Sequence, residues 1–282
     1  MNNQIEIWVN NYNTNETKKS AITSLNSLRN YLKNNDITEI DFIESMKLKP
    51  DAKYLKLNEY QKSLNVMPAS AKKYHAFIKS YLRVIHGIKL DIEDQKQYIK
   101  FKPVARVNRE PLTKEIIKEI CINSNDYYRA LWLVLSSSGM RISEALSLTK
   151  EDYDFSVKPI TIIIPAIETK TQAERITFIS KEAYAAIQKT NFFEARSLST
   201  VESYFWKLRN KLNLIDRYAG TRNYKVNIHS MRAYTRTQAG KINQDFAEAL
   251  LGHEGYLRQY VRLEKKDMVN YYSKLEPKLK IF

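Results

Sequence analysis

Two of the four histidines in this sequence of 282 residues lie within residues 227–255. His229 and Arg232 are three residues apart, and His253 directly follows Gly252. Residues three apart share one face of a helix, so the first pair would present an imidazole beside a guanidinium. An imidazole transfers protons near neutral pH, and a guanidinium holds a phosphate through two parallel hydrogen bonds. Taken singly, each histidine would be interpreted as a core or capping residue.

The charge of the chain indicates what it binds. The formal net charge is +15 and the pI is about 9.6. Residues 1–100 hold 16 Lys and Arg against 11 Asp and Glu, and the remainder holds 30 against 20, so both parts are basic. Such a field favours a polyanion, and nucleic acid is the first candidate. A merely soluble basic protein is the plainer alternative.

Several other classes of protein are disfavoured. The single cysteine, Cys121, excludes an internal disulfide framework, makes a Cys/His zinc site unexpected and suits a reducing cytoplasm. The longest apolar runs, such as residues 130–135, are far too short to span a bilayer. The first residues lack the basic start and apolar stretch of a signal peptide. We therefore expect a cytoplasmic protein, and its length favours two domains.

Residues 1–100 are predicted to form an all-helical domain. Apolar residues recur at the helical interval in residues 18–35 and, most strongly, in residues 69–90, where Gly87 is a natural stop. Two prolines, three basic residues and no periodicity then mark a linker, which we place at 101–111. An ordinary solvated linker and a segment lying along a phosphate backbone explain that composition equally well.

Residues 112–282 are predicted to form a second domain that is mainly α with a small β-sheet. The apolar residues 126–139 form a helix that ends at Gly139. The β-rich runs 158–167 and 174–180 form a hairpin. Further helices are expected in residues 113–124, 181–190, 200–214, 229–241, 245–253 and 265–275.

Four segments of the second domain occur in a recognisable order. Arg141 lies in "SSSGMRISEALSL" and Lys170 lies in "ETKTQAERITFI". His229 and Arg232 form "HSMR", and His253 lies in "LLGHEG", with tyrosines following. Each motif is weak alone, but their order and spacing resemble the tyrosine recombinase (phage integrase, Xer-type) family. The resemblance extends from the linker to the last helix, while residues 1–100 match only as a basic helical module of suitable size.

The resemblance implies a role for each of these residues. Arg141 and Arg232 would hold the non-bridging oxygens of a DNA phosphodiester, and Glu144 would orient Arg141 or only cap a helix. Lys170 would protonate the departing 5′ oxygen. His229 would accept the proton of the nucleophilic tyrosine, whose ordinary pKa is about 10. His253 would donate a hydrogen bond to the phosphate, with Gly252 letting the backbone come close. His75 and His86 have no such role.

The nucleophile is the least determined residue of the site. The family usually places its tyrosine about nine residues after the histidine of Leu-Gly-His, where this sequence has Arg262. Tyr256 follows His253 too closely, and the position of Tyr272 is that of a packing face. Tyr260 is our choice because "VRLEKKDMVNYY" after it resembles the helix that follows the family's tyrosine. Tyr271 is the next candidate.

The sequence therefore predicts a site-specific recombinase with an N-terminal SAM-like core-binding domain and a C-terminal catalytic domain. The resemblance implies a 3′-phosphotyrosine intermediate, double-stranded DNA as the substrate, a tetramer on two sites, and no metal or other cofactor. Two alternatives stay open: a type IB topoisomerase-like enzyme, and a DNA-binding relative without activity. A mobile-element integrase and a chromosome-dimer resolvase fit equally. The last helix would dock either on a neighbouring subunit, as the family often does, or on its own domain.

Overall fold

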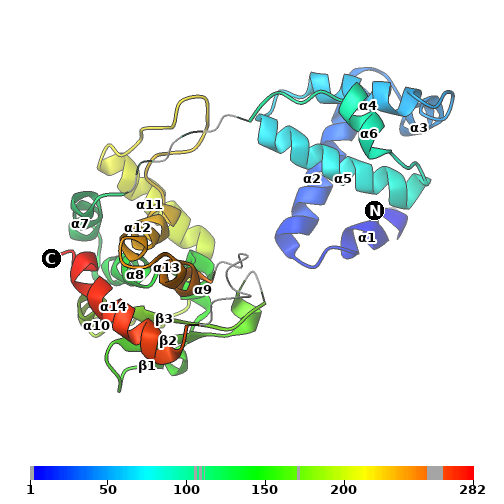
Figure 1. Cartoon of the computed structure of the whole chain (residues 1–282). Helices are drawn as coiled ribbons and strands as arrows, with labels where there is room; N and C mark the ends of the chain where they lie inside the picture. The colour runs from blue at the N-terminus through cyan, green and yellow to red at the C-terminus, as the bar shows by residue number, and fades with distance from the viewer. Residues whose placement is uncertain (1–2, 105–106, 108–109, 111, 170–171, 253–262) are drawn as a thin grey trace. The chain divides into compact units, whose positions relative to one another are not determined.

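The computed structural model describes residues 3–104, 107, 110, 112–169, 172–252 and 263–282. The chain divides into two compact units, Met1–Arg106 and Val107–Phe282 (Figure 1). This division falls within residues 101–111, where the sequence shows a linker composition. Each unit is described by itself below.

Unit 1 is all helical in its described part, as predicted. Its core is formed by large side chains such as Trp8, Leu28 and Tyr60, each 1% exposed or less. The longest apolar stripe forms the helix α5, which begins at Pro68 and ends at Gly87, whose φ of 68° suits glycine. The helices are α1 (Asn3–Asn10), α2 (Asn15–Asn34), α3 (Glu39–Ser45), α4 (Ala52–Ser63), α5 (Pro68–His86) and α6 (Ile92–Tyr98).

The two histidines of unit 1 are structural, as expected. His75 is 7% exposed; its Nε2 lies 3.1 Å from Gln95 Oε1, and its ring packs edge-on against Phe101. His86 lies 3.2 Å from the Tyr81 hydroxyl. Burial lowers the pKa of both imidazoles, which therefore stay neutral at physiological pH.

Unit 2 is mainly helical with one small sheet, which confirms the predicted fold class. Its helices are α7 (Lys114–Ile122), α8 (Asp126–Ser138), α9 (Ile142–Ser147), α10 (Lys181–Ile187), α11 (Leu198–Lys211), α12 (His229–Gly240), α13 (Gln244–Leu251) and α14 (Lys265–Leu279). Residues 150–152 and 166–168 form the one-turn 3-10 helices η1 and η2.

The sheet has the strand order β1-β2-β3 and is antiparallel throughout. The predicted hairpin consists of β2 (Ile160–Ile164) and β3 (Arg175–Ile179), with Ile164 opposite Arg175. A third strand, β1 (Tyr153–Asp154), pairs with β2 and was not predicted because two residues are too short to show alternation.

Helix α8 is the centre of unit 2. All but two of its thirteen residues are buried, and it packs against α7, α10, α12 and β3. It ends at Gly139, whose φ is 66°. The last carbonyls of a helix have no partner within it, and here side chains from three other elements supply donors: Thr235 Oγ1 to Ser136 O at 2.8 Å, Tyr272 Oη to Ser137 O at 3.0 Å, and Thr177 Oγ1 to Ser138 O at 2.7 Å.

The C-terminal residues pack on their own unit. The predicted face of α14 is buried, with Met268, Tyr272, Leu275 and Leu279 at 7% exposure or less. Beyond the helix, Glu182 accepts hydrogen bonds from the backbone amides of Ile281 and Phe282 at 2.9 and 2.7 Å. Of the two docking alternatives for the last helix, the structure therefore shows the one on its own domain.

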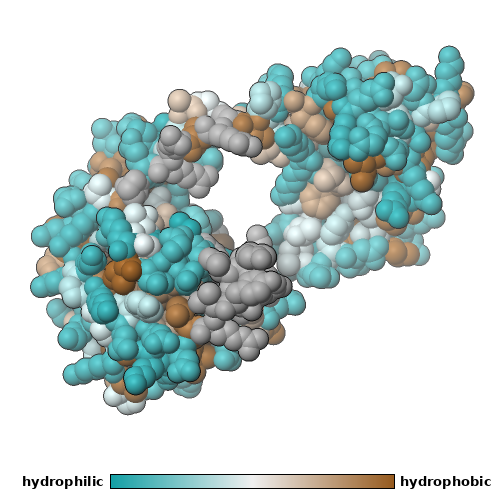
Figure 2. Space-filling view, viewed as in Figure 1, coloured by the Kyte–Doolittle hydropathy of each residue, from teal (hydrophilic) through white to brown (hydrophobic). Residues whose placement is uncertain are grey.

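The visible face of the molecule is polar, and no described helix is suited to a membrane. The face shown in Figure 2 is mostly hydrophilic, with isolated hydrophobic residues. Among the described residues, no helix combines the length and the apolar character needed to cross a bilayer.

Removing the Tyr272 hydroxyl should destabilise unit 2. Tyr272→Phe leaves the buried Ser137 carbonyl without this donor, so we expect the free energy of unfolding to fall by about 1–3 kcal/mol in chemical denaturation. Tyr271→Phe is the matched control, because the Tyr271 hydroxyl makes no hydrogen bond with the described residues, and it should change stability by less than about 0.5 kcal/mol. Equal stability of the two variants would contradict the role assigned to Tyr272.

Candidate active site

Arg141 is placed by the end of α8 and the start of α9. It follows Gly139 and Met140 directly and lies in extended conformation just before the first residue of α9. Its backbone amide donates to Glu144 Oε2 and its guanidinium NH1 donates to Glu144 Oε1, both at 2.7 Å. Glu144 therefore both caps α9 and orients the Arg141 side chain, which remains 24% exposed.

Arg232 lies on α12 and is 3% exposed. Its NH1 donates to Gly139 O at 2.5 Å and its NH2 donates to Leu251 O at 2.6 Å. One planar fork thus joins the end of α8 to the end of α13. This geometry fixes the guanidinium with two buried backbone contacts, which a flexible ammonium group could not reproduce together.

Arg175, at the first position of β3, is a third arginine of the cluster. Its NH2 donates to Glu144 Oε2 at 2.5 Å and its NH1 donates to Leu250 O at 2.7 Å. The side chain is 8% exposed. It also explains Gly252, because a Cβ at that position would lie 2.4 Å from Arg175 Cδ. Gly252 has a φ of 65°, so both its conformation and this close approach require glycine.

The three arginines converge on one carboxylate. Glu144 is fully buried; it pairs with Arg141 and Arg175, and its Oε2 lies 4.0 Å from Arg232 NH1. Burial, together with the positive charges of Arg175 and Arg141, lowers the pKa of Arg232 to about 9. Because the guanidiniums repel one another, an anion brought among them is favoured. The cluster therefore has the charge and the planar donors of a phosphate site.

His229 is the first residue of α12 and is exposed, whereas Arg232 one turn later is buried. The helix start is held by Asn227 and Ser230, since the Ser230 amide donates to Asn227 Oδ1 and the Asn227 amide donates to Ser230 Oγ, both at 3.1 Å. The structure thus places the predicted imidazole and guanidinium on one helix, with the imidazole at its N-terminus.

Lys170, His253 and Tyr260 lie outside the described residues. The structure describes what flanks Lys170: Thr169 is 5% exposed, and its Oγ1 accepts from the Ala173 amide at 3.0 Å. Of the other tyrosines, Tyr272 is fully buried with its hydroxyl on Ser137 O, and burial raises its pKa well above the ordinary value. Tyr272 is therefore a packing residue, as predicted. Tyr271 is half-buried against Phe246.

In the part of the chain that the structure describes, no group of three or more His, Cys, Asp or Glu side chains is arranged to hold a metal ion. Cys121 is buried, and burial raises the pKa of its thiol to about 12, so this cysteine is not a nucleophile.

A family model for the phage integrase family matches residues 110–266, which is more than half of the sequence. The chain belongs to the phage integrase family. This confirms the resemblance drawn from Arg141, Lys170, "HSMR" and "LLGHEG". Every residue of the arginine cluster lies inside the matched region.

Solved structures of tyrosine recombinases share the fold of this phage integrase family member. Lambda integrase (75–356), solved as a dimer bound to a core site, aligns over 93% of this chain and 96% of its own with a TM-score of 0.63 and 17% identity. XerH recombinase bound to difH covers 91% of this chain and 78% of its own, with a TM-score of 0.56 and 17% identity. The Tn1549 transposon integrase on circular intermediate DNA covers 76% and 82%, with a TM-score of 0.52 and 15% identity.

Curated relatives include transposase A of transposon Tn554 from Staphylococcus aureus. It is 25% identical over 203 residues, which cover 64% of this chain and 56% of the relative. The phage integrase chain therefore spans about half the length of these curated relatives.

Sequence analysis of this family member missed Arg175 as a site residue. "AERITF" reads as the start of a strand, and an arginine there suggests a solvent-facing edge. Strand β3 is buried on both faces, so a charge at its first residue needs an acidic partner, but this burial is seen only in the structure. Glu144 was considered only for Arg141.

Replacing Glu144 should expose the repulsion between the three arginines. Glu144→Gln leaves them without the shared carboxylate, so we expect a loss of about 3–5 kcal/mol of unfolding free energy. Sulfate, compared with chloride at equal ionic strength, should raise the melting temperature of this variant more than that of the unaltered protein. Sulfate stabilises folded proteins in general, and comparing the variant with the unaltered protein removes that general effect.

Glu194→Gln is the control, because Glu194 pairs with Arg196 at the surface and its loss should cost less than about 1 kcal/mol. If the two variants lose the same stability, or if sulfate favours neither, then Glu144 does not balance the cluster as described.

Proposed function

We propose that this protein is a site-specific DNA recombinase that cuts and rejoins duplex DNA through a 3′-phosphotyrosine intermediate. The observation that carries the proposal is the cluster of Arg141, Arg175 and Arg232 around the buried Glu144. Family membership and the titles of the structural neighbours, which describe recombinases bound to DNA, support it.

In the proposed reaction the arginines act on the scissile phosphate. Arg141 and Arg232 hold its two non-bridging oxygens and stabilise the charge that builds on them during attack. Glu144 and Arg175 position these groups without touching the DNA. Because the pKa of Arg232 is about 9, this guanidinium carries its proton at neutral pH.

The remaining roles follow the family pattern, with Tyr260 taken as the nucleophile although it lies two residues before the usual position. The hydroxyl oxygen of Tyr260 attacks phosphorus, and His229 takes its proton. The bond to the 5′ oxygen breaks, Lys170 protonates that oxygen, and His253 donates a hydrogen bond to the phosphate. The new phosphotyrosine bond conserves the energy of the broken bond, so the reverse attack by a 5′ hydroxyl rejoins DNA without a nucleotide or a metal cofactor.

The two units have separate roles in this proposal. Residues 1–100 are a helical, SAM-like core-binding domain, residues 101–111 are the linker, and residues 112–282 are the catalytic domain. Both parts are basic and would bind the duplex together. Lambda integrase has been solved as a tetramer on a Holliday junction, and we extend that assembly, a homotetramer on two sites, to this chain. We place the protein in the cytoplasm, where cell fractionation would find it.

Two rivals are separated from this proposal by assays. A type IB topoisomerase-like enzyme would relax supercoiled DNA as a monomer without a specific site. A DNA-binding relative without activity would bind but form no covalent adduct on a nicked suicide substrate. That substrate can be built on a site selected from random duplexes by binding.

Arg141→Lys should abolish most cleavage while leaving DNA binding nearly unchanged. The substitution keeps the charge but loses the planar fork, and removal of a preorganised stabilising group costs about 10²–10³ in rate. Single-turnover adduct formation on the nicked substrate measures the effect. Arg196→Lys, at the surface pair with Glu194, is the control and should cleave normally.

Arg232→Lys should lose cleavage to a similar degree, and its melting temperature must be measured as well because Arg232 also holds two buried carbonyls. Near-normal cleavage by either the Arg141 or the Arg232 variant would remove that residue from the catalytic set.

Tyr260 should be the residue joined to DNA. Tyr260→Phe should bind the selected site with unchanged affinity and form no adduct, because the phenyl ring has no nucleophile. Tyr271→Phe is the matched control and should still form it. Peptide mapping of the trapped adduct identifies the residue directly, and a phosphotyrosine at 271 would refute this choice while leaving the family assignment unchanged.

A further inference from the structure

Two arginines enclose one tyrosine on the segment that joins α11 to α12. The guanidinium carbon of Arg209 lies 3.4 Å from the centre of the Tyr224 ring, and that of Arg217 lies 4.4 Å from it. Arg217 NH2 also donates to the Tyr224 hydroxyl at 2.8 Å. The stacked ring holds both guanidiniums in place.

The segment is folded as a small hairpin rather than an open loop. Arg217 and Tyr224 form an antiparallel bridge, which puts their side chains on the same face. The Tyr218 amide donates to Asn223 O at 3.0 Å and the Lys225 amide donates to Asp216 O at 2.8 Å. In Figure 1 this segment, yellow to gold, projects beyond the helices of its unit.

The end of α11 and the hairpin that follows it carry an excess of positive charge. Residues 207–225 contain six basic residues and one acidic residue, Asp216. Arg209 is 7% exposed, and its Nε is buried without a hydrogen-bond partner in the described structure. No carboxylate of the described residues forms an ion pair with Arg209 or Arg217. The hydrogen bond from Arg217 and the charges of both arginines lower the pKa of the Tyr224 hydroxyl.

Without a bound anion, the electrostatic free energy of this cluster is unfavourable. Two guanidiniums repel each other across one ring, and burial disfavours the charge on Arg209. An oxyanion beside the exposed Arg217 would offset both effects and would accept hydrogen bonds from its free N–H groups. A base edge would not, because a neutral acceptor leaves the repulsion unchanged.

We propose that Arg209, Tyr224 and Arg217 form a second phosphate site, separate from the arginine cluster, which binds a non-scissile phosphate of the same duplex. This inference rests on the proposed function. The site is coupled to the catalytic helix, because Asn227 Nδ2 donates to Tyr224 O at 3.2 Å and Asn227 Oδ1 accepts from the Ser230 amide in the first turn of α12 at 3.1 Å. Binding of a backbone phosphate by the hairpin therefore helps to fix the helix that carries His229 and Arg232.

The dependence of DNA affinity on salt tests this site. We would measure the affinity of the full chain for the selected duplex by fluorescence anisotropy across a range of salt concentrations. Arg217→Gln should reduce the slope of log K against log salt by about 0.9, the value of one lost phosphate contact, on specific and random duplexes alike. Arg217→Lys keeps the charge and should keep the slope.

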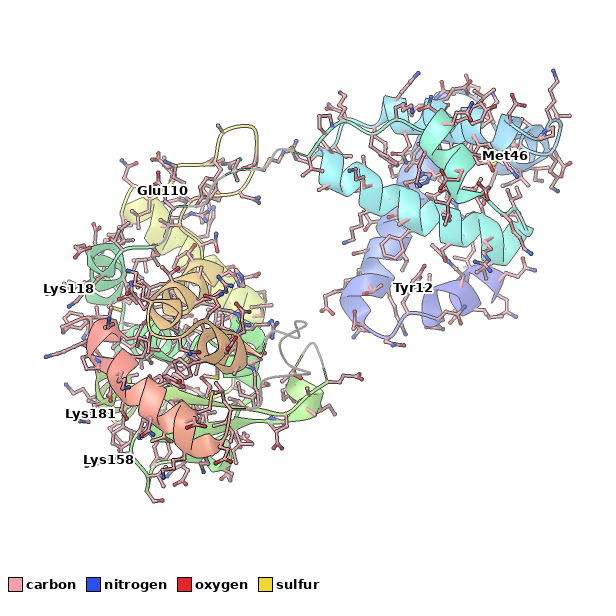
Figure 3. The ribbon with its side chains drawn as sticks, in the orientation of Figure 1. Tyr12, Met46, Glu110, Lys118, Lys158 and Lys181 are labelled. Atoms are coloured by element: carbon pink, nitrogen blue, oxygen red, sulfur yellow. The ribbon has the colours of Figure 1, made fainter. Side chains whose placement is uncertain are left out.

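Lys158→Gln is the charge-matched control. Lys158 is exposed and lies at the opposite end of the unit from the hairpin between α11 and α12 (Figure 3). It should leave the slope unchanged.

The outcomes separate the two proposals. If the unaltered protein binds and cleaves DNA but Arg217→Gln keeps the full slope, the second phosphate site is wrong and the proposed function stands. The site is also wrong if Lys158→Gln lowers the slope as much as Arg217→Gln does. If the unaltered protein shows no salt-dependent binding to DNA, the proposed function fails and this inference fails with it.

Discussion

The carbonyls at the end of α8, which have no partner within the helix, determine the arrangement of unit 2. A helix that is buried along almost its whole length cannot leave its last carbonyls to water. Side chains from β3, α12 and α14 supply the donors for residues 136–138, and Arg232 supplies one for Gly139. The same turn delivers Arg141 two residues later. The hydrogen-bonding requirement of one helix end therefore brings the sheet, the helix of His229 and the last helix to the candidate site.

The arginine cluster is consequently part of the fold as well as the site. Arg232 spans the ends of α8 and α13, and Arg175 spans Glu144 and the end of α13. Each guanidinium uses part of its donor set on buried backbone oxygens and is thereby fixed in orientation. Such preorganisation favours a transition state because the donors do not have to move when charge develops. Burial and the charges of Arg175 and Arg141 lower the pKa of Arg232, and the carboxylate of Glu144 partly offsets their repulsion.

The sequence predicted what depends on local pattern and on order along the chain. Helical periodicity and the glycines at 87 and 139 identified two helix ends, and two β-rich runs identified the β2–β3 hairpin. Arg175 could not be found this way, because its partners at Glu144 and Leu250 are 31 and 75 residues away. Gly252 was expected to let the backbone approach a phosphate, whereas the structure gives it a neighbour in Arg175 Cδ. Long-range burial, which decides both cases, leaves no periodic signal in the sequence.

The arginines of unit 2 form two groups that differ in the partners that hold them: those around Glu144, and the pair on the Tyr224 ring. Those in the cluster share a buried carboxylate, and Arg175 and Arg232 also bind backbone carbonyls, so their charge is partly offset within the fold and their geometry is rigid. Arg209 and Arg217 have an aromatic ring as their common partner, which orients a guanidinium without neutralising it. An acidic side chain at 224 would have offset part of this positive charge and weakened the affinity for an anion. A tyrosine there preserves the positive charge and still holds the two side chains in fixed positions, which is the combination that recognition of a phosphate backbone requires.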